Sequence, residues 1–591
     1  MIFYGAASRT IGVAEALADI AGAIDEALSP SLPVERHAAW VAALVAAGGL
    51  AQGLADAAAE APERDVRAPV QEAASAAAMM LACALARVMG RSWCSDFADL
   101  PRTAPLDVAD ALAALRSLDM PDAVDVRVTE GFAHYAVYPE AYWIAAVALP
   151  PPRPAEVIGI RSIGTTLAAV VAAALDAPCP ATVRPHGHPF ARQVAFSPQL
   201  DAAVRRLVGA VWAIADEGPG LSGSSFGAVA DALASRGVPA ERIVLFASHG
   251  NAPGCMASDA HRRLWREARR PLATFEDLLL DPARTDRGLA GWVVDITGPL
   301  VAPPVDLAGG AWRRWHFARH EAWPAVDRQN ERRKYLLHGK HGGFLLRFAG
   351  LGRLGTDKLA RARALAEAGF GLPPLGFRHG FVVEVWRDDL RPLDWSTADR
   401  AAVLDRLACY LGFRARAFPA SEREGASPAA LFDMARVNAA EGLGEPVARH
   451  MDVLAARLDG LGRVMQPVAI DGRLQPHEWL DDGRGFLVKT DALDHCAGHD
   501  LVGCQDIAWD VAGAAVEFDL APEETEALRI ATARQGGVAC DGDLVAFFRI
   551  AYAAFTLGAL AMACERETGV EADRLTEAIA RRAAALGQAI G

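Results

Sequence analysis

The sequence predicts a multidomain α/β protein: a helical N-terminal region, then a parallel-sheet domain, then a C-terminal domain with two lobes. Three observations favour this fold class. The chain has 591 residues, which at about 100–200 residues per domain corresponds to several domains. It is 52% hydrophobic and 22% charged, which excludes a disordered chain. Its middle part alternates strand-like and helix-like segments, as chains that form parallel sheets do.

Shifts in composition place the predicted boundaries. The helical region covers 1–118, the parallel-sheet domain 119–280, a connector 281–325 and the C-terminal domain 326–591. The connector is rich in glycine and proline, and its aromatic and basic residues 312–315 indicate an interdomain patch rather than a surface that stacks on nucleic acid.

Charge and cysteine content restrict the function. The net charge of −14 disfavours general binding to nucleic acid or to an anionic membrane. The nine cysteines are odd in number and lack CxxC spacing, which favours reduced thiols in a cytoplasm. Apolar stretches at 73–86 and 550–564 fall short of the roughly 20 residues of a membrane span. We therefore expect a cytoplasmic protein without a signal peptide or a membrane partner.

The N-terminal region shows apolar residues at three- and four-residue spacing over 13–28 and 37–59, which predicts amphipathic helices. No chemical motif stands out there. The expected role is a helical cap or a layer through which a homo-oligomer forms.

The parallel-sheet domain is predicted from short apolar runs. Strands are expected at 124–128, 157–160, 211–214 and 242–247, with helices at 166–175 and 226–236. The aromatic segment 132–149 is also expected to be β-rich.

The most informative segment is 211–225. A buried strand leads into Asp216 and Glu217, and a turn containing Gly220 and Gly223 then opens a helix. Two neighbouring carboxylates can each accept a hydrogen bond from a ribose hydroxyl. Backbone N–H groups at a helix start can hold a phosphate. The carboxyl edge of a parallel sheet is where such folds bind ligands.

This segment resembles the phosphoribosyl diphosphate-binding loop of the type I phosphoribosyltransferases. The two acids match, and residues 222–225 match the family's serine/threonine–glycine turn, although this loop is slightly longer. The resemblance implies displacement at the ribose anomeric carbon. Asp216 and Glu217 would hold the ribose hydroxyls, and Arg161 with Mg²⁺ would stabilise the departing diphosphate.

Two further segments extend this resemblance. Residues 158–166 match the loop that holds the diphosphate, and 183–192 match a basic flap that closes over the site; its two histidines, His186 and His188, are as compatible with a plain surface loop. The predicted substrate-binding residues are Ser162, Gly164, Thr165, Arg184, Arg192, Gly220, Ser222, Gly223, Ser224 and Ser225.

The C-terminal domain is predicted to begin with strands at 344–348 and 381–386 around a helix at 357–368, and to end in long helices. Residues 331–515 resemble the aminoglycoside phosphotransferases and related small-molecule kinases. The resemblance implies a two-lobed, kinase-like fold that binds ATP, with Arg347 and Glu384 at the nucleotide.

The catalytic segment departs from that family. Over 471–478, Arg473 occupies the position of the catalytic base and Glu478 that of a magnesium-binding asparagine, and an arginine cannot accept a proton near neutral pH. Asp491 is retained after an apolar strand. Asp491 and Glu478 are therefore the predicted metal ligands. The surrounding Asp494, His495, His499 and Asp500 form either part of a metal site or a solvated loop with one structural aspartate.

Three functions remain open. The leading one is a phosphoribosyltransferase-like enzyme, with Mg²⁺ as cofactor, fused to a divergent kinase-like domain. The alternatives are a small-molecule kinase with a ribose-phosphate sensing domain, which would use ATP, and a non-catalytic regulator that binds nucleotides. All three predict a phosphorylated small-molecule partner, and the acceptor is not identifiable from the residues.

Overall fold

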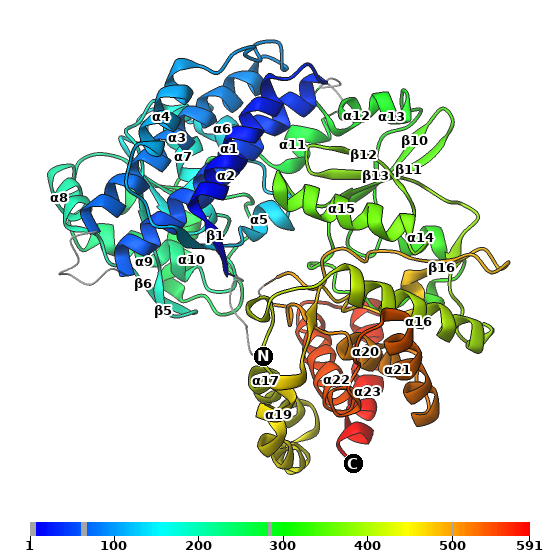
Figure 1. The fold of residues 1–591 in the computed structure, drawn as a ribbon. Helices are drawn as coiled ribbons and strands as arrows, with labels where there is room; N and C mark the ends of the chain where they lie inside the picture. Colours follow the sequence, from blue (N-terminus) through cyan, green and yellow to red (C-terminus); the bar gives the residue numbers. More distant parts are fainter. Residues whose placement is uncertain (1–7, 61–67, 282–286, 499) are drawn as a thin grey trace.

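The computed structural model describes residues 8–60, 68–281, 287–498 and 500–591. It is a mixed α/β structure with a helical N-terminus and several separate sheets, which confirms the predicted fold class at this level. The elements form three groups (Figure 1). The N-terminal helices and the parallel sheet form one group, the antiparallel sheet lies beside them, and the C-terminal helices form the third group.

The N-terminal region consists of α1 (Val13–Leu28), α2 (Pro33–Glu60), α3 (Ala68–Cys94) and α4 (Leu106–Arg116). Helix α1 buries five residues at three- and four-residue spacing, as its sequence predicts. The strand expected near 124 is β2 (Ala123–Arg127), and it pairs antiparallel with β1 (Ser8–Gly12).

Among the described residues, three helical stretches are long and apolar enough to cross a membrane by length and composition: Pro33–Ala58, Glu72–Cys94 and Gly542–Cys564. The expectation that the apolar stretches at 73–86 and 550–564 are too short for a span is therefore wrong, because each belongs to a longer apolar helix. In this structure 61–72% of each of these apolar windows is buried inside the chain. Their apolar surface is therefore used mainly for packing within the protein.

The aromatic segment 132–149 is helical, so the expectation of strands there is wrong. It forms α5 (Glu130–Ala133) and α6 (Pro139–Val147). Seven of the nine α6 residues are buried, and the Trp143 ring lies so close to Gly90 of α3 that a Cβ there would meet it at 2.2 Å. The aromatic residues thus reflect burial on all sides, which periodicity alone does not distinguish from a strand.

The parallel sheet has the order β4-β3-β7-β8, from β3 (Glu156–Ile160), β4 (Ala181–Val183), β7 (Trp212–Ala215) and β8 (Ile243–Phe246). Helix α7 (Ile163–Leu175) packs on one face together with α2 and α3. Helices α8 (Pro198–Arg206), α9 (Ser224–Ala234) and α10 (Asp259–Glu267) cover the other face. The hairpin β5 (His186–His188) and β6 (Ala191–Gln193) follows β4. The predicted strand–helix–strand rhythm is confirmed.

The antiparallel sheet has the order β12-β13-β11-β10-β9. Its strands are β9 (Val305–Asp306), β10 (Lys334–Gly339), β11 (Gly342–Phe348), β12 (Pro374–Arg378) and β13 (Phe381–Val385), with α15 (Arg353–Glu367) between β11 and β12. The connector contributes β9 and three short helices, α12 (Leu289–Trp292), α13 (Val294–Thr297) and α14 (Arg313–His316). The apolar face of this sheet shares one hydrophobic core with the N-terminal helices, so the two regions are packed together.

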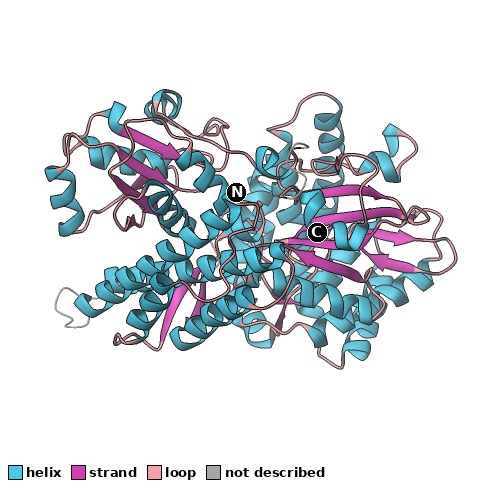
Figure 2. Ribbon diagram, turned by 90° about the horizontal axis from the view of Figure 1, so that it is seen from above, coloured by secondary structure: helices cyan, strands magenta, loops and turns pink. Residues whose placement is uncertain are grey.

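The C-terminal helices have a core of their own, and Figure 2 shows that the strands of the chain lie in separate groups among the helices. The helices are α16 (Arg400–Ala417), α17 (Pro428–Leu443), α18 (Glu445–Ala448), α19 (Leu458–Val464), α20 (Ala508–Glu517), α21 (Pro522–Gly536), α22 (Gly542–Cys564) and α23 (Val570–Ile590). The strands are β14 (Arg391–Pro392), β15 (Pro467–Val468), β16 (Trp479–Asp481), β17 (Leu487–Lys489) and β18 (Gln505–Asp506).

Candidate functional site

A cavity of about 820 Å³ lies between the antiparallel sheet and the C-terminal helices. Both sides contribute charged side chains to its lining. The sheet supplies Lys334, Arg347 and Glu384, and the C-terminal part supplies Arg473, Glu478 and Asp491. The structure therefore brings the predicted nucleotide-binding residues Arg347 and Glu384 to the same cavity as the predicted metal ligands Glu478 and Asp491, although Arg347 and Asp491 are 144 residues apart in the chain.

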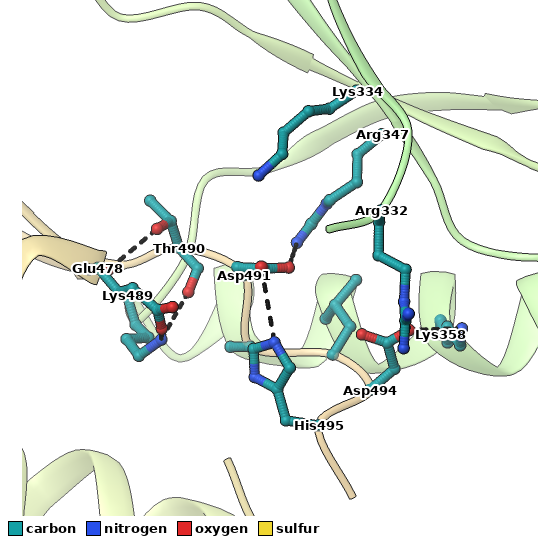
Figure 3. A network of polar contacts seen from close by, with 12 residues as sticks. Arg332, Lys334, Arg347, Lys358, Glu478, Lys489, Thr490, Asp491, Asp494 and His495 are labelled. Atoms are coloured by element: carbon teal, nitrogen blue, oxygen red, sulfur yellow. Dashed lines mark hydrogen bonds and ion pairs between the residues drawn. The ribbon is translucent and has the colours of Figure 1, made fainter. Parts of the chain in front are cut away.

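Asp491 follows β17 and has a left-handed backbone, with φ of 48°. Its carboxylate lies 3.4 Å from Arg347 Nη1 and 3.6 Å from His495 Nε2 (Figure 3). Burial alone would raise the pKa of Asp491, but His495, Lys334 and Arg347 hold it well below its usual range. The carboxylate is therefore ionised at neutral pH, as a metal ligand must be.

Asp494 is differently placed, although it lies with Asp491 and His495 in a group whose ligand atoms are all within 4.8 Å of one another. A single oxygen, Oδ2, contacts Lys358 Nζ at 2.8 Å, Arg332 Nε at 3.2 Å and His134 Nδ1 at 3.2 Å. Because three nitrogen groups already surround this oxygen, Asp494 is a structural anion, and Asp491 is the carboxylate better able to accept a cation. His499 lies outside the described residues.

The predicted catalytic segment is held by buried polar contacts. The backbone N–H groups of Asp471 and Gly472 donate to Asp510 at 2.7 and 2.9 Å. Asp471 itself is completely buried and accepts a hydrogen bond from Tyr410. Burial and the charge of Asp471 raise the pKa of Asp510 to about 7. This scaffold fixes the loop that carries Arg473 and Glu478 into the cavity.

Glu478 is held by Lys489, whose Nζ lies 2.7 Å from Oε2. Burial raises the pKa of Glu478, so this carboxylate is more basic than an exposed one. Burial and nearby cations lower the pKa of His477 to about 3, and its ring stacks on Trp312 at 5.9 Å. Trp312 from the connector thus lines the cavity, a role that its sequence context did not indicate.

The two predicted phosphate loops lie at the same edge of the parallel sheet, because β3 and β7 are adjacent parallel strands. They touch at Gly164, where a Cβ would lie 2.4 Å from the Ala215 carbonyl oxygen, so only glycine fits. Burial raises the pKa of Asp216 to about 7. Arg161, Thr165 and Glu217 stand at this edge as well, and Thr165 is buried.

The serine turn contacts the predicted flap. Gly220 and Gly223 have left-handed backbones, with φ of 56° and 64°, which a tight turn before a helix requires. Ser222 and Ser224 donate hydrogen bonds to the Pro189 carbonyl oxygen in the β5–β6 hairpin. Arg192 closes that hairpin on itself by donating a hydrogen bond to the Gly187 carbonyl oxygen, and Ser225 lies in the first turn of α9.

Sequence reasoning missed Asp56 of α2. Its carboxylate lies 2.9 Å from Arg161 Nη1 and 3.1 Å from Arg184 Nε. Burial would raise the pKa of Asp56, but the two arginines lower it. A carboxylate thus pairs with two of the three arginines predicted for a phosphorylated ligand. Within α2 it shows only as one polar residue of a largely apolar helix that is buried on most sides, so no local signal could have identified it.

A short helix joins the two sites. Gly131 of α5 packs on the Glu217 side chain, such that a Cβ would meet Oε2 at 2.8 Å. Further along this helix, the Ala133 carbonyl oxygen accepts a hydrogen bond from Lys358 at 2.8 Å. The next residue, His134, contacts the Asp494 carboxylate. The four residues 131–134 therefore contact both the predicted ribose loop, at Glu217, and the loop after Asp491, at Asp494.

No protein-family profile matches this chain, and no curated protein matches it. Similar solved structures include the choline kinase LicA from Streptococcus pneumoniae, with 18% identity over 42% of this chain and 89% of that chain (TM-score 0.30). Macrolide 2′-phosphotransferase type I has 14% identity over 51% and 98% (TM-score 0.32). Spectinomycin phosphotransferase APH(9)-Ia has 8% identity over 42% and 84% (TM-score 0.28).

By name, these three proteins are a choline kinase and two antibiotic phosphotransferases. The phosphoribosyltransferase resemblance has no counterpart among them. At such low scores the likeness carries no argument about function, which rests instead on the geometry of the two sites.

Proposed function

We propose that the C-terminal part binds a nucleoside triphosphate with Mg²⁺ and transfers a phosphoryl group to a small-molecule acceptor. The observation that carries this proposal is the ionised Asp491 carboxylate in a cavity of about 820 Å³ whose lining includes Lys334, Arg347 and Arg473. A polyphosphate needs several cations at close range. A carboxylate beside it is the usual protein ligand for Mg²⁺.

The cavity also has an apolar part suited to a nucleobase. Leu307, Leu345, Val385 and Trp386 line it near the charged groups. Ligand sites commonly combine apolar walls with a few convergent polar groups in this way.

Asp491 would hold the metal, which would neutralise charge on the phosphates. Arg347 and Lys334 would bind phosphate oxygens, and Glu478, whose pKa is raised by burial, would orient the acceptor hydroxyl. Phosphoryl transfer depends mainly on positioning and on charge stabilisation. Arg473 in place of a base is therefore compatible with transfer.

Calorimetry with ATP, with and without Mg²⁺, tests the binding step. We expect Mg²⁺-dependent binding that Asp491→Asn weakens at least tenfold, while Asp433→Asn, a matched change at an exposed helix position, has no effect. Labelled ATP with a panel of alcohols, amino alcohols and ribosides then tests transfer. ATP binding without any turnover would favour the nucleotide-binding regulator instead, and absence of ATP binding would refute both functions.

A second candidate function concerns the edge of the parallel sheet. The adjacency of β3 and β7, with both phosphate loops at one edge, supports our proposal that a ribose 5-phosphate compound binds at Asp216, Glu217 and Ser222–Ser225. Phosphoribosyl transfer at this site remains the corresponding enzymatic hypothesis. Titration with phosphoribosyl diphosphate should show binding that the Asp216→Asn/Glu217→Gln double variant loses. Equal affinity in that variant would exclude the site.

A further inference from the structure

Two histidines and a glutamate meet in the core between the N-terminal helices and the antiparallel sheet. His37 lies on α2, Glu140 on α6 and His379 in the turn between β12 and β13. The Nε2 atoms of His37 and His379 lie 2.9 and 2.7 Å from the same Glu140 oxygen, Oε1. The three side chains are 0–3% exposed. They come from positions 103 and 239 residues apart in the chain.

The residues around this group are mostly aromatic, and further hydrogen bonds hold its two histidines in place. His37 Nδ1 lies 3.0 Å from Ser92 Oγ, which fixes the ring with Nε2 toward Glu140. Tyr138 donates to the His379 carbonyl oxygen at 2.7 Å. Aromatic rings of Trp93, Phe97 and Trp292 pack around the imidazoles.

One oxygen of the Glu140 carboxylate lacks a hydrogen-bond partner among the described residues. Its second oxygen, Oε2, is buried and has no hydrogen-bond partner there, and the ion pairs found for this carboxylate are those with the two imidazoles. A fully buried carboxylate requires a positive charge beside it. Either an imidazolium or a bound cation must supply that charge.

We propose that His37, Glu140 and His379 bind a divalent transition-metal ion, with Zn²⁺ as the best match. Two imidazole nitrogens and a carboxylate are a common zinc donor set. Ligand atoms of one tetrahedral ion at bond lengths of about 2.0–2.1 Å are about 3.3 Å apart, so the two separations in this group, 2.9 and 2.7 Å, would each lengthen by about half an ångström on binding. Glu140 Oε2 supplies a fourth donor. Ser92 orients His37 as outer partners of zinc-bound histidines do.

The consequence of this site is structural. The ion would join α2 and α6 to the β12–β13 turn, and β13 carries Glu384, which contacts Arg347 at 3.2 Å in the cavity. The site is independent of the proposed nucleotide function, because it shares no residue with the cavity lining.

The test is metal analysis of the full chain purified without a histidine tag. We expect about one zinc per chain in the wild type and in Asp491→Asn, which disrupts the second group of possible metal ligands found among the described residues. Glu140→Gln and His379→Gln should each lose it, and a chelator should lower the Tm of the wild type but not of Glu140→Gln. Retention of zinc in Glu140→Gln with loss in Asp491→Asn would overturn the assignment.

A measurement on the unaltered chain protects the test against variants that fail to fold. Zinc-edge X-ray absorption of the wild type should show two imidazole ligands, and Co²⁺ substitution should give the visible bands of a low-coordinate nitrogen–oxygen site. A wild type that carries no zinc and takes up neither metal on titration would refute the proposal, and a histidine proton would then neutralise Glu140.

Discussion

Replacing Asp494 by asparagine should lower local stability by about 3–5 kcal/mol, the cost of removing one partner from a buried ion pair. Asp494 and Lys358 are 5% and 8% exposed. One oxygen of Asp494 contacts Lys358 at 2.8 Å and Arg332 and His134 at 3.2 Å each. Asparagine keeps the shape but leaves two buried cations without an anion, so the penalty exceeds that of a single lost hydrogen bond.

Hydrogen exchange measured on peptides covering α15 and α5 reports this loss locally. At about 1.4 kcal/mol per tenfold change, we expect exchange there to accelerate by about two to four orders of magnitude. The matched control is Asp389→Asn, which removes a surface pair with Arg387 and should cost under about 1 kcal/mol. Asp494→Leu combined with Lys358→Met should recover part of the loss, because an apolar pair can replace a buried ion pair.

Lowering the pH should destabilise this region as the Asp494→Asn substitution does. Burial would raise the pKa of Asp494, but Lys358, Arg332 and His134 hold it well below its usual range. A lowered pKa in the folded state gives stability that is present above the unfolded pKa, near 4, and is lost as the pH falls further. Asp494→Asn should flatten this dependence. The reasoning is wrong if Asp494→Asn exchanges like the surface control, or if it abolishes ATP binding with exchange unchanged, since Asp494 would then be a metal ligand.

Three further predictions concern the edge of the parallel sheet. Asp56→Asn should strengthen binding of pyrophosphate or phosphoribosyl diphosphate in calorimetry, because it releases two arginines from a carboxylate; weaker or equal binding would contradict this. Gly164→Ala should lower the free energy of unfolding by about 1–3 kcal/mol through overpacking, since the new Cβ would lie 2.4 Å from a carbonyl oxygen. The control Gly209→Ala, whose Cβ would have no neighbour within 4 Å, should leave the free energy of unfolding unchanged. Thermal unfolding measures both. Burial raises the pKa of Asp216 to about 7, so the free energy of unfolding should fall as the pH rises from about 4 to about 7. Asp216→Asn should remove this pH dependence of the free energy of unfolding. An unchanged dependence would count against the raised pKa of Asp216.

Periodic segments were predictable from the sequence alone. The apolar spacing in α1 and α2, the strand–helix–strand rhythm around β3, β7 and β8, and the helices of the C-terminal part depend on neighbours within one or two turns, which local pattern records. The two loops predicted to bind phosphate and the segment from Asp471 to Asp491 were selected from their residue types and from their resemblance to known families. Their proposed roles remain predictions.

Local pattern failed where burial came from several sides at once. The segment 132–149 carries aromatic residues because α6 packs against α3 and α7, with Trp143 pressed on Gly90. The connector was expected to link domains, yet it supplies β9 to the antiparallel sheet and Trp312 to the cavity. Both outcomes depend on contacts between distant segments, which propensity does not contain.

The sequence by itself determined most of the periodic helices and strands and the kinds of charged group in each loop. Only the tertiary structure decided which charges meet: Asp56 with Arg161 and Arg184, Asp494 with Lys358, and Glu140 with two histidines. The physical reason is that a buried charge requires a partner of opposite sign or a bound ion, and the chain supplies that partner from wherever packing brings one near. The residue types in a loop therefore indicate which ligands it can bind, and the packing of the chain determines which of its charged groups already pair with other side chains.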